Sequence, residues 1–230
     1  CFGNEFAEAI WLFAKAIPKF LSNPITSPVD FISGPRRTST PLNFLNGNTA
    51  SFTANIFFVL LLKLNLDIFS DQIFQIIEHL SLDKIALVGF SLGGMIARKF
   101  ALKYNDRLWA LAILNSAHKR TKKAKEAVQL RVNSVIENGP QSTIEDALER
   151  WFTKNFREKN PIIMDRIRKW VLANKKEVYP KAYQVLVDGV DELLQTPLPI
   201  NCPSLVFSGV EDFGNSAEMS LEISILILKS

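Results

Sequence analysis

Residues 84–104 read KIALVGFSLGGMIARKFALKY, and this stretch decides how the rest of the chain is interpreted. The apolar run at 84–88 is typical of a short buried strand, and the segment at 94–104 is typical of a helix. Between them lies a Gly-x-Ser-x-Gly turn centred on Ser91. Where such a turn joins a strand to a helix, the serine hydroxyl projects from a sharp bend. The stretch therefore predicts a nucleophile at Ser91.

Two glycines flank this serine for a physical reason. Gly89 and Gly93 have no Cβ, so the strand and the helix can pass close to each other beside Ser91. The helix that follows directs its first N–H groups at the same place, and we expect the backbone N–H of Leu92 to stabilise an oxyanion there. The alternative is a strand–helix turn that needs glycines for packing alone.

The segment Gly89–Gly94 resembles the nucleophile elbow of the α/β-hydrolase fold family, in the branch of lid-bearing esterases and enol-lactone hydrolases. The resemblance implies an α/β fold with a mostly parallel sheet and a helical lid inserted between strands. It also implies that Ser91 forms an acyl-enzyme with a carboxylic ester or lactone. In this family the triad residues follow the chain order Ser, then Asp or Glu, then His.

A candidate for the triad acid lies far along the chain. The short strand expected at 204–208 is followed by Gly209-Val210-Glu211-Asp212, which resembles the family's strand and Gly-x-x-Asp turn. The resemblance implies Asp212 as the acid, with Glu211 as the local alternative. An aspartate in a turn also commonly caps the next helix, so a structural role is the competing interpretation.

The triad histidine has no evident position. The chain contains only His79 and His118, and neither follows Asp212. In one interpretation the chain is a fragment altered at both ends, because it starts at Cys1 and lacks the family's His-Gly loop. We then expect it to be nearly inactive. In the other interpretation His118, at the carboxyl end of the strand expected at 108–114, serves as the base. Whether this chain is itself an enzyme is therefore left open.

The chain is expected to form one α/β unit, incomplete at its ends, with an insertion. We expect residues 1–66 to be a poorly interpretable N-terminal part of the core and residues 67–118 to be the core with the elbow. We expect a helical lid at 119–196 and a return strand with a truncated C-terminus at 197–230. Ser33-Gly34 is the nearest positional candidate for a second oxyanion donor. The apolar run at 108–114 favours a strand that is buried on both faces.

An amphipathic helix is expected at 67–80, because apolar residues recur there along one stripe. Asp67 and Ser70 are its expected N-terminal caps. His79 lies near the C-terminal end of this helix, where an imidazole suits the helix dipole, so we expect a structural role for it.

The positive charge is concentrated in one segment. The chain carries a net charge of +4, but Lys119–Lys181 holds 16 Lys and Arg against 8 Asp and Glu. These basic residues alternate with apolar ones at helical spacing, which is typical of solvated helix faces and does not favour nucleic-acid binding. The more specific interpretation is that these positive charges attract an anionic substrate or an acidic carrier protein.

The composition excludes several other classes. Only two cysteines occur, so no disulfide framework is implied, and a reducing compartment such as the cytoplasm is expected. The longest apolar run, Ile56–Leu62, is too short to span a bilayer. No histidine–cysteine cluster or nucleotide-binding glycine pattern is present, so we expect neither a metal nor a cofactor. The sequence predicts a serine hydrolase for a small ester or lactone. The alternatives are a non-catalytic small-ligand-binding module and an inactive gene fragment.

Overall fold

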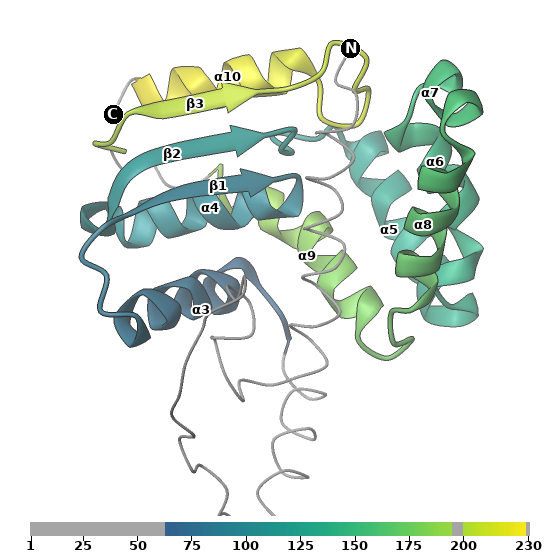
Figure 1. Ribbon diagram of the computed structural model, residues 1–230, viewed down its shortest axis with the longest axis horizontal. Coiled ribbons are helices and arrows are strands. Elements are labelled where there is room, and N and C mark those ends of the chain that lie inside the picture. The colour runs from purple at the N-terminus through teal and green to yellow at the C-terminus, as the bar shows by residue number, and fades with distance from the viewer. Residues whose placement is uncertain (1–62, 195–199, 229–230) are drawn as a thin grey trace, which may run out of the picture.

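The framework of the protein is a sheet of parallel strands (Figure 1). The computed structural model describes residues 63–194 and 200–228. Within these ranges the strand order is β1–β2–β3, with β1 at Ile85–Phe90, β2 at Leu108–Leu114 and β3 at Ser204–Phe207. Val88 pairs with Ala112, which in turn pairs with Leu205. The predicted parallel α/β arrangement is confirmed.

Helices of the described ranges form two groups. The core group is α3 (Leu66–His79), α4 (Leu92–Lys103) and α10 (Ala217–Leu228). The second group lies between β2 and β3 in the chain, and we call it the inserted helices: α5 (Lys122–Asn138), α6 (Ile144–Trp151), α7 (Lys154–Lys159), α8 (Pro161–Leu172) and α9 (Tyr179–Glu192). Two 3₁₀ turns, Asn105–Arg107 and Pro140–Ser142, connect elements. The carboxyl ends of all three strands point towards the inserted helices (Figure 1).

The core helices cover one face of the sheet. Leu111 and Ile113 of β2 pack there against Ile77 of α3, Phe100 of α4 and Ile223 of α10, and each of the five is at most 2% exposed. Because Leu111 and Ile113 are two residues apart on one strand, their side chains share a face. The face that carries Val88 and Leu205 differs, since these side chains are 64% and 60% exposed.

The expectation that residues 108–114 are buried on both faces is therefore wrong. Trp109 is 60% exposed, and the burial of β2 alternates along much of its length. The apolar composition of the strand could not distinguish the two cases, because it does not show on which face other elements pack.

The start of α3 also differs from expectation. Its N-cap is Asn65, whose side-chain oxygen accepts a hydrogen bond of 3.0 Å from the N–H of Ile68. Asp67 and Ser70, the expected caps, instead lie inside the helix. Asparagine is as good a cap as aspartate or serine, so the sequence alone offered several starting points within one turn.

Helix α9 joins the inserted helices to the core. A Cβ built on its Gly189 would lie 2.9 Å from the Leu66 side chain and 3.1 Å from the end of Met95, so only glycine fits between α9 and these core helices. Val185 and Val190 of α9 are buried in the same cluster as Leu92, the first residue of α4. The inserted helices are thus packed against the start of α4.

Within residues 63–194 and 200–228, no helix combines the length and the apolar character that crossing a bilayer requires.

The arrangement predicts a sharp difference between two isoleucines. Ile113→Ala should lower the free energy of unfolding by about 2–5 kcal/mol, because the side chain is fully buried and its removal leaves a cavity. Ile162→Ala makes the same chemical change at a side chain that is 75% exposed, and it should change stability by less than about 0.5 kcal/mol. Urea denaturation followed by circular dichroism measures both, and equal losses would contradict the assigned core.

Candidate active site

Ser91 lies at a sharp bend between β1 and α4. Its backbone angles are φ 53° and ψ −115°, in a region that residues other than glycine rarely occupy. Neighbouring groups hold this conformation: the Ser91 N–H donates to the carbonyl of Leu114 at 2.9 Å, and the Ser91 carbonyl accepts from Ser116 Oγ at 3.1 Å. The predicted strand–bend–helix arrangement is confirmed, and it depends on the end of β2.

The glycines around the bend are required by close approaches. A Cβ on Gly89 would lie 2.2 Å from the carbonyl oxygen of Gly93 and 2.8 Å from the Ala97 Cβ. The strand and the helix therefore pass as closely as the motif predicted. Gly94 has a separate role, because a Cβ there would lie 2.6 Å from the Cβ of Ser116.

The hydroxyl of Ser91 is not used to stabilise the helix. Ser91 occupies the N-cap position of α4, yet its side chain makes no capping hydrogen bond. Leu92 and Gly93 begin α4, while the N–H groups of Gly94 and Met95 donate to the carbonyl of Ser91. The N–H groups at the very start of a helix have no partner within it. The bend thus places a hydroxyl beside N–H groups able to bind an anion.

Asp212 follows β3 and is held from two sides. Its Oδ2 accepts a hydrogen bond of 2.7 Å from Nδ2 of Asn115, and its Oδ1 accepts from the N–H groups of Gly214 at 3.0 Å and Asn215 at 2.9 Å. The carboxylate thus supports its own turn and also faces the end of β2, while its role as the triad acid stays a prediction. Glu211, the local alternative, is exposed to solvent.

The loop Asn115–His118 connects the two predicted site residues. Ser116 donates to the carbonyl of Ser91, while the adjacent Asn115 donates to Asp212. Asn115 has a positive φ of 46°, and its N–H donates to the carbonyl of Phe207 at 2.8 Å. No roles for Asn115 and Ser116 were predicted from the sequence. Their position directly after a buried strand could have indicated a place at the site, because ligands of parallel sheets bind at this edge.

His118 lies in the same loop but faces other groups. It is 3% exposed, with Nδ1 3.5 Å from a guanidinium nitrogen of Arg98 and Nε2 3.6 Å from a carboxylate oxygen of Glu222. Burial, followed by the charge of Arg98, lowers the pKa of His118 to about 4. Both ring nitrogens thus have neighbours other than Ser91, which disfavours His118 as the base.

Three further features of the sequence concern a second oxyanion donor, metal-ligating side chains and His79. Ser33-Gly34, the candidate for a second oxyanion donor, lies outside the described residues. Within the described ranges, no group of three or more His, Cys, Asp or Glu side chains is arranged to hold a metal ion. His79 is the last residue of α3, near the helix end as predicted, and its side chain is exposed.

The sequence of residues 63–160 matches the model of a family described as the alpha/beta hydrolase fold. A curated relative, the (E)-2-((N-methylformamido)methylene)succinate hydrolase of Acinetobacter baylyi, is 30% identical over 156 residues, which cover 68% of this chain and 58% of that protein. The chain has the α/β-hydrolase fold. A second relative of the chain, 3-oxoadipate enol-lactonase 2 of the same organism, is 26% identical and covered to 54% of its length.

Solved structures agree with this family. An esterase from Thermogutta terrifontis, with malate bound, superposes with a TM-score of 0.63 at 26% identity over 71% of this chain and 61% of that one. The enol-lactonase from Burkholderia xenovorans superposes with a TM-score of 0.62 over 71% of this chain and 62% of that one; at 19% identity this likeness concerns the fold alone. The chain spans little more than half the length of the curated relatives it matches.

The elbow geometry predicts the effect of one added methyl group. Gly89→Ala should destabilise the protein by about 1–3 kcal/mol or more, because the new Cβ collides with the backbone at Gly93. Gly209→Ala is the matched control, since its Cβ would meet nothing closer than Asn115 Nδ2 at 4.0 Å. Thermal unfolding compares the two variants. A wild-type melting temperature for Gly89→Ala would contradict the close crossing of β1 and α4.

The environment of His118 predicts a pH dependence of stability. Its folded pKa of about 4 is below the ordinary value of 6.5, so the unfolded chain binds more protons between these values. This contribution, about 3 kcal/mol at most, is fully present above pH 6.5 and is lost as the pH falls towards 4. His118→Gln should therefore reduce the stability difference between pH 7.5 and pH 4.5, as measured by urea denaturation.

His79→Gln is the control for this experiment, because His79 is exposed at the end of α3. It should retain the loss of stability that protonation of His118 causes between pH 7.5 and pH 4.5. An unchanged slope in His118→Gln would show that the imidazole of His118 titrates normally.

Proposed function

We propose that Ser91 is the nucleophile of an acyl-transfer reaction on a small carboxylic ester or lactone. The observation that carries this proposal is the strained bend at Ser91, whose hydroxyl is left free of capping beside the first N–H groups of α4. Strained backbone of this kind is typical of functional sites. The hydroxyl oxygen would attack the acyl carbon and give up its proton, and the N–H of Leu92 would donate to the resulting oxyanion. The acyl C–O bond would then break, and the alcohol oxygen would leave with a proton, so that Ser91 carries the acyl group.

Asp212 is proposed as the acid that orients a base and stabilises it when protonated. Hydrogen bonds from Asn115, Gly214 and Asn215 fix the orientation of its carboxylate. His118, the histidine in the loop after β2, faces Arg98 and Glu222. Because these contacts hold its ring away from the role of base, we infer that the described residues acylate Ser91 slowly and that they hydrolyse the acyl-enzyme more slowly still.

The names of the relatives suggest the substrate class. One relative is named for a methylene-succinate derivative and another for 3-oxoadipate enol-lactone, which are small acyl compounds that carry carboxylate groups. We propose a small, anionic ester or lactone as the substrate. A reducing location such as the cytoplasm is part of the proposal, because Cys202 is a free thiol.

The inserted helices are proposed to act as a lid over the site. Phe90, adjacent to Ser91, packs against their cluster of Ile144, Leu148, Phe152, Met164, Ile167 and Val171. Apolar side chains next to the nucleophile would exclude water and contact the substrate.

A non-catalytic ligand-binding module is the second candidate. It is favoured by one observation, the orientation of His118 towards Arg98 and Glu222. Such a module would retain the lid and the anion-binding N–H groups without turnover.

Acylation of Ser91 distinguishes these candidates. After incubation with p-nitrophenyl acetate, mass spectrometry should find an acetyl group on the peptide that contains Ser91, because His118 is not oriented to assist deacylation. Steady turnover should exceed the uncatalysed rate by no more than about 10³–10⁴-fold, the residual rate when a triad member is missing. A fluorophosphonate probe should label the same residue.

Ser91→Ala should abolish acetylation and labelling, whereas Ser204→Ala should preserve both. Ser204 is an exposed serine on β3 whose hydroxyl donates to the carbonyl of Cys202. A folded wild-type chain that is neither acetylated nor labelled would favour the binding module.

A further inference from the structure

The excess of positive charge in the inserted helices is not evenly neutralised. Several basic side chains there have acidic partners: Arg168 with Glu145 and Asp165, Arg157 with Glu149, Lys154 with Glu158, Lys122 with Glu126, and Lys125 with Asp191. Among the described residues, Arg120, Arg131 and Arg150 form no ion pair with a carboxylate. We call these three the arginine cluster.

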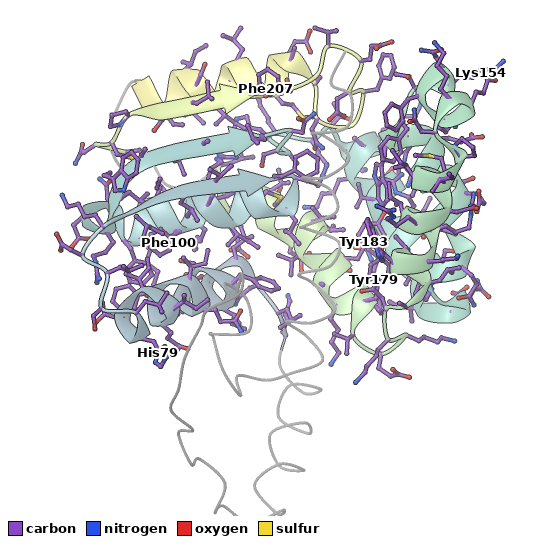
Figure 2. All side chains as sticks on the ribbon, in the orientation of Figure 1. His79, Phe100, Lys154, Tyr179, Tyr183 and Phe207 are labelled. Carbon is purple, nitrogen blue, oxygen red and sulfur yellow. The ribbon has the colours of Figure 1, made fainter. Side chains whose placement is uncertain are left out.

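The arginine cluster lies around Tyr183 of α9. Arg131 of α5 donates from Nε to the hydroxyl oxygen of Tyr183 at 3.2 Å. Arg120, just before α5, donates to the carbonyl of Leu186, less than one helical turn from Tyr183. Figure 2 shows Tyr179 and Tyr183 between α9 and the neighbouring inserted helices. The two rings are 5.9 Å apart.

Electrostatic effects support the proximity of these charges. Burial lowers the pKa of Arg120 and of Arg150, and the next cause in both is the positive charge of Arg131. Asp146 opposes this effect at Arg150, but its influence on that pKa is smaller than that of Arg131. Like charges held together without an acidic partner favour the binding of an anion.

The arginine cluster is also close to the elbow. Leu186, which accepts the hydrogen bond of Arg120, packs against the cluster that contains Leu92 and Ala117. Phe90 and Tyr179 each pack against the buried cluster of the inserted helices. Leu92, directly after Ser91, shares its own cluster with Val185 and Val190 of α9, the helix that carries Tyr183.

We propose that Arg120, Arg131 and Arg150, together with the hydroxyl of Tyr183, bind a carboxylate group of the substrate. This inference rests on the proposed function and specifies which part of the substrate the inserted helices recognise. The chemistry fits, because guanidinium groups donate two parallel hydrogen bonds to a planar carboxylate. Tyr183 accepts from Arg131, so its own O–H remains able to donate. The acyl group would then extend from this position towards Ser91.

The occupant is tested with adipate, a dicarboxylate, and with adipamide, its uncharged counterpart. Isothermal titration calorimetry on the full chain should detect binding of adipate and at least about tenfold weaker binding of adipamide, since the loss of charged hydrogen bonds exceeds the free energy of a tenfold change. Adipate binding should weaken as salt is added, because screening reduces the attraction.

Variants locate the binding site. Arg131→Gln should weaken adipate binding by about tenfold or more, and Arg131→Lys should give an intermediate affinity because it keeps the charge without the fork. Arg166→Gln removes the same charge from an exposed position on α8 and should change the affinity by less than about twofold. Circular dichroism verifies folding. If Arg131→Gln does not fold, Arg150→Gln, at the exposed side of the arginine cluster, takes its place.

Two outcomes would overturn the inference: wild-type protein that does not distinguish adipate from adipamide, or equal losses in Arg131→Gln and Arg166→Gln. Acetylation of Ser91 is measured on the same samples. Acetylation without selective adipate binding removes the carboxylate site and leaves the acyl-transfer proposal intact. Selective binding without acetylation supports the arginine cluster and favours the binding module.

Discussion

The arrangement of this protein depends on how closely β1 and α4 pass each other at Gly89 and Gly93. That contact leaves no room for a Cβ, and it forces the backbone of Ser91 to a positive φ. Such a conformation costs on the order of 1–3 kcal/mol and persists only where neighbours hold it. Here the neighbours are the carbonyl of Leu114 and the hydroxyl of Ser116. The bend at Ser91 therefore depends on the end of β2 as well as on β1 and α4.

The same loop supports the rest of the site. Asn115 orients Asp212, Ser116 holds Ser91, and Arg98 of α4 donates to the carbonyl of Ala117 at 3.4 Å. The loop therefore contacts both Ser91, at the end of β1, and Asp212, which follows β3. The inserted helices contact this region from above the strand ends, through Phe90 and Leu92 on either side of the serine. Ser91, Asp212 and the inserted helices are thus all held close to the end of β2.

Local patterns in the sequence predicted much of this arrangement. The apolar runs predicted β1, β2 and β3, and the motif predicted the bend, because these features depend on near neighbours in the chain. The exposure of Trp109 and the contacts of His118 could not be predicted, since they depend on which distant helices pack against the sheet. The hydrogen bond from Asn115 to Asp212 joins residues 97 positions apart, and no spacing rule reveals it.

The close approach of Gly94 to Ser116 has a consequence for how such sequences change over time. The two positions share one small volume, because a Cβ on Gly94 would lie 2.6 Å from that of Ser116. A larger residue at one position therefore requires a smaller residue, or a displaced backbone, at the other. Substitutions at the two sites are expected to be accepted together, as a compensating pair linking α4 to the loop after β2.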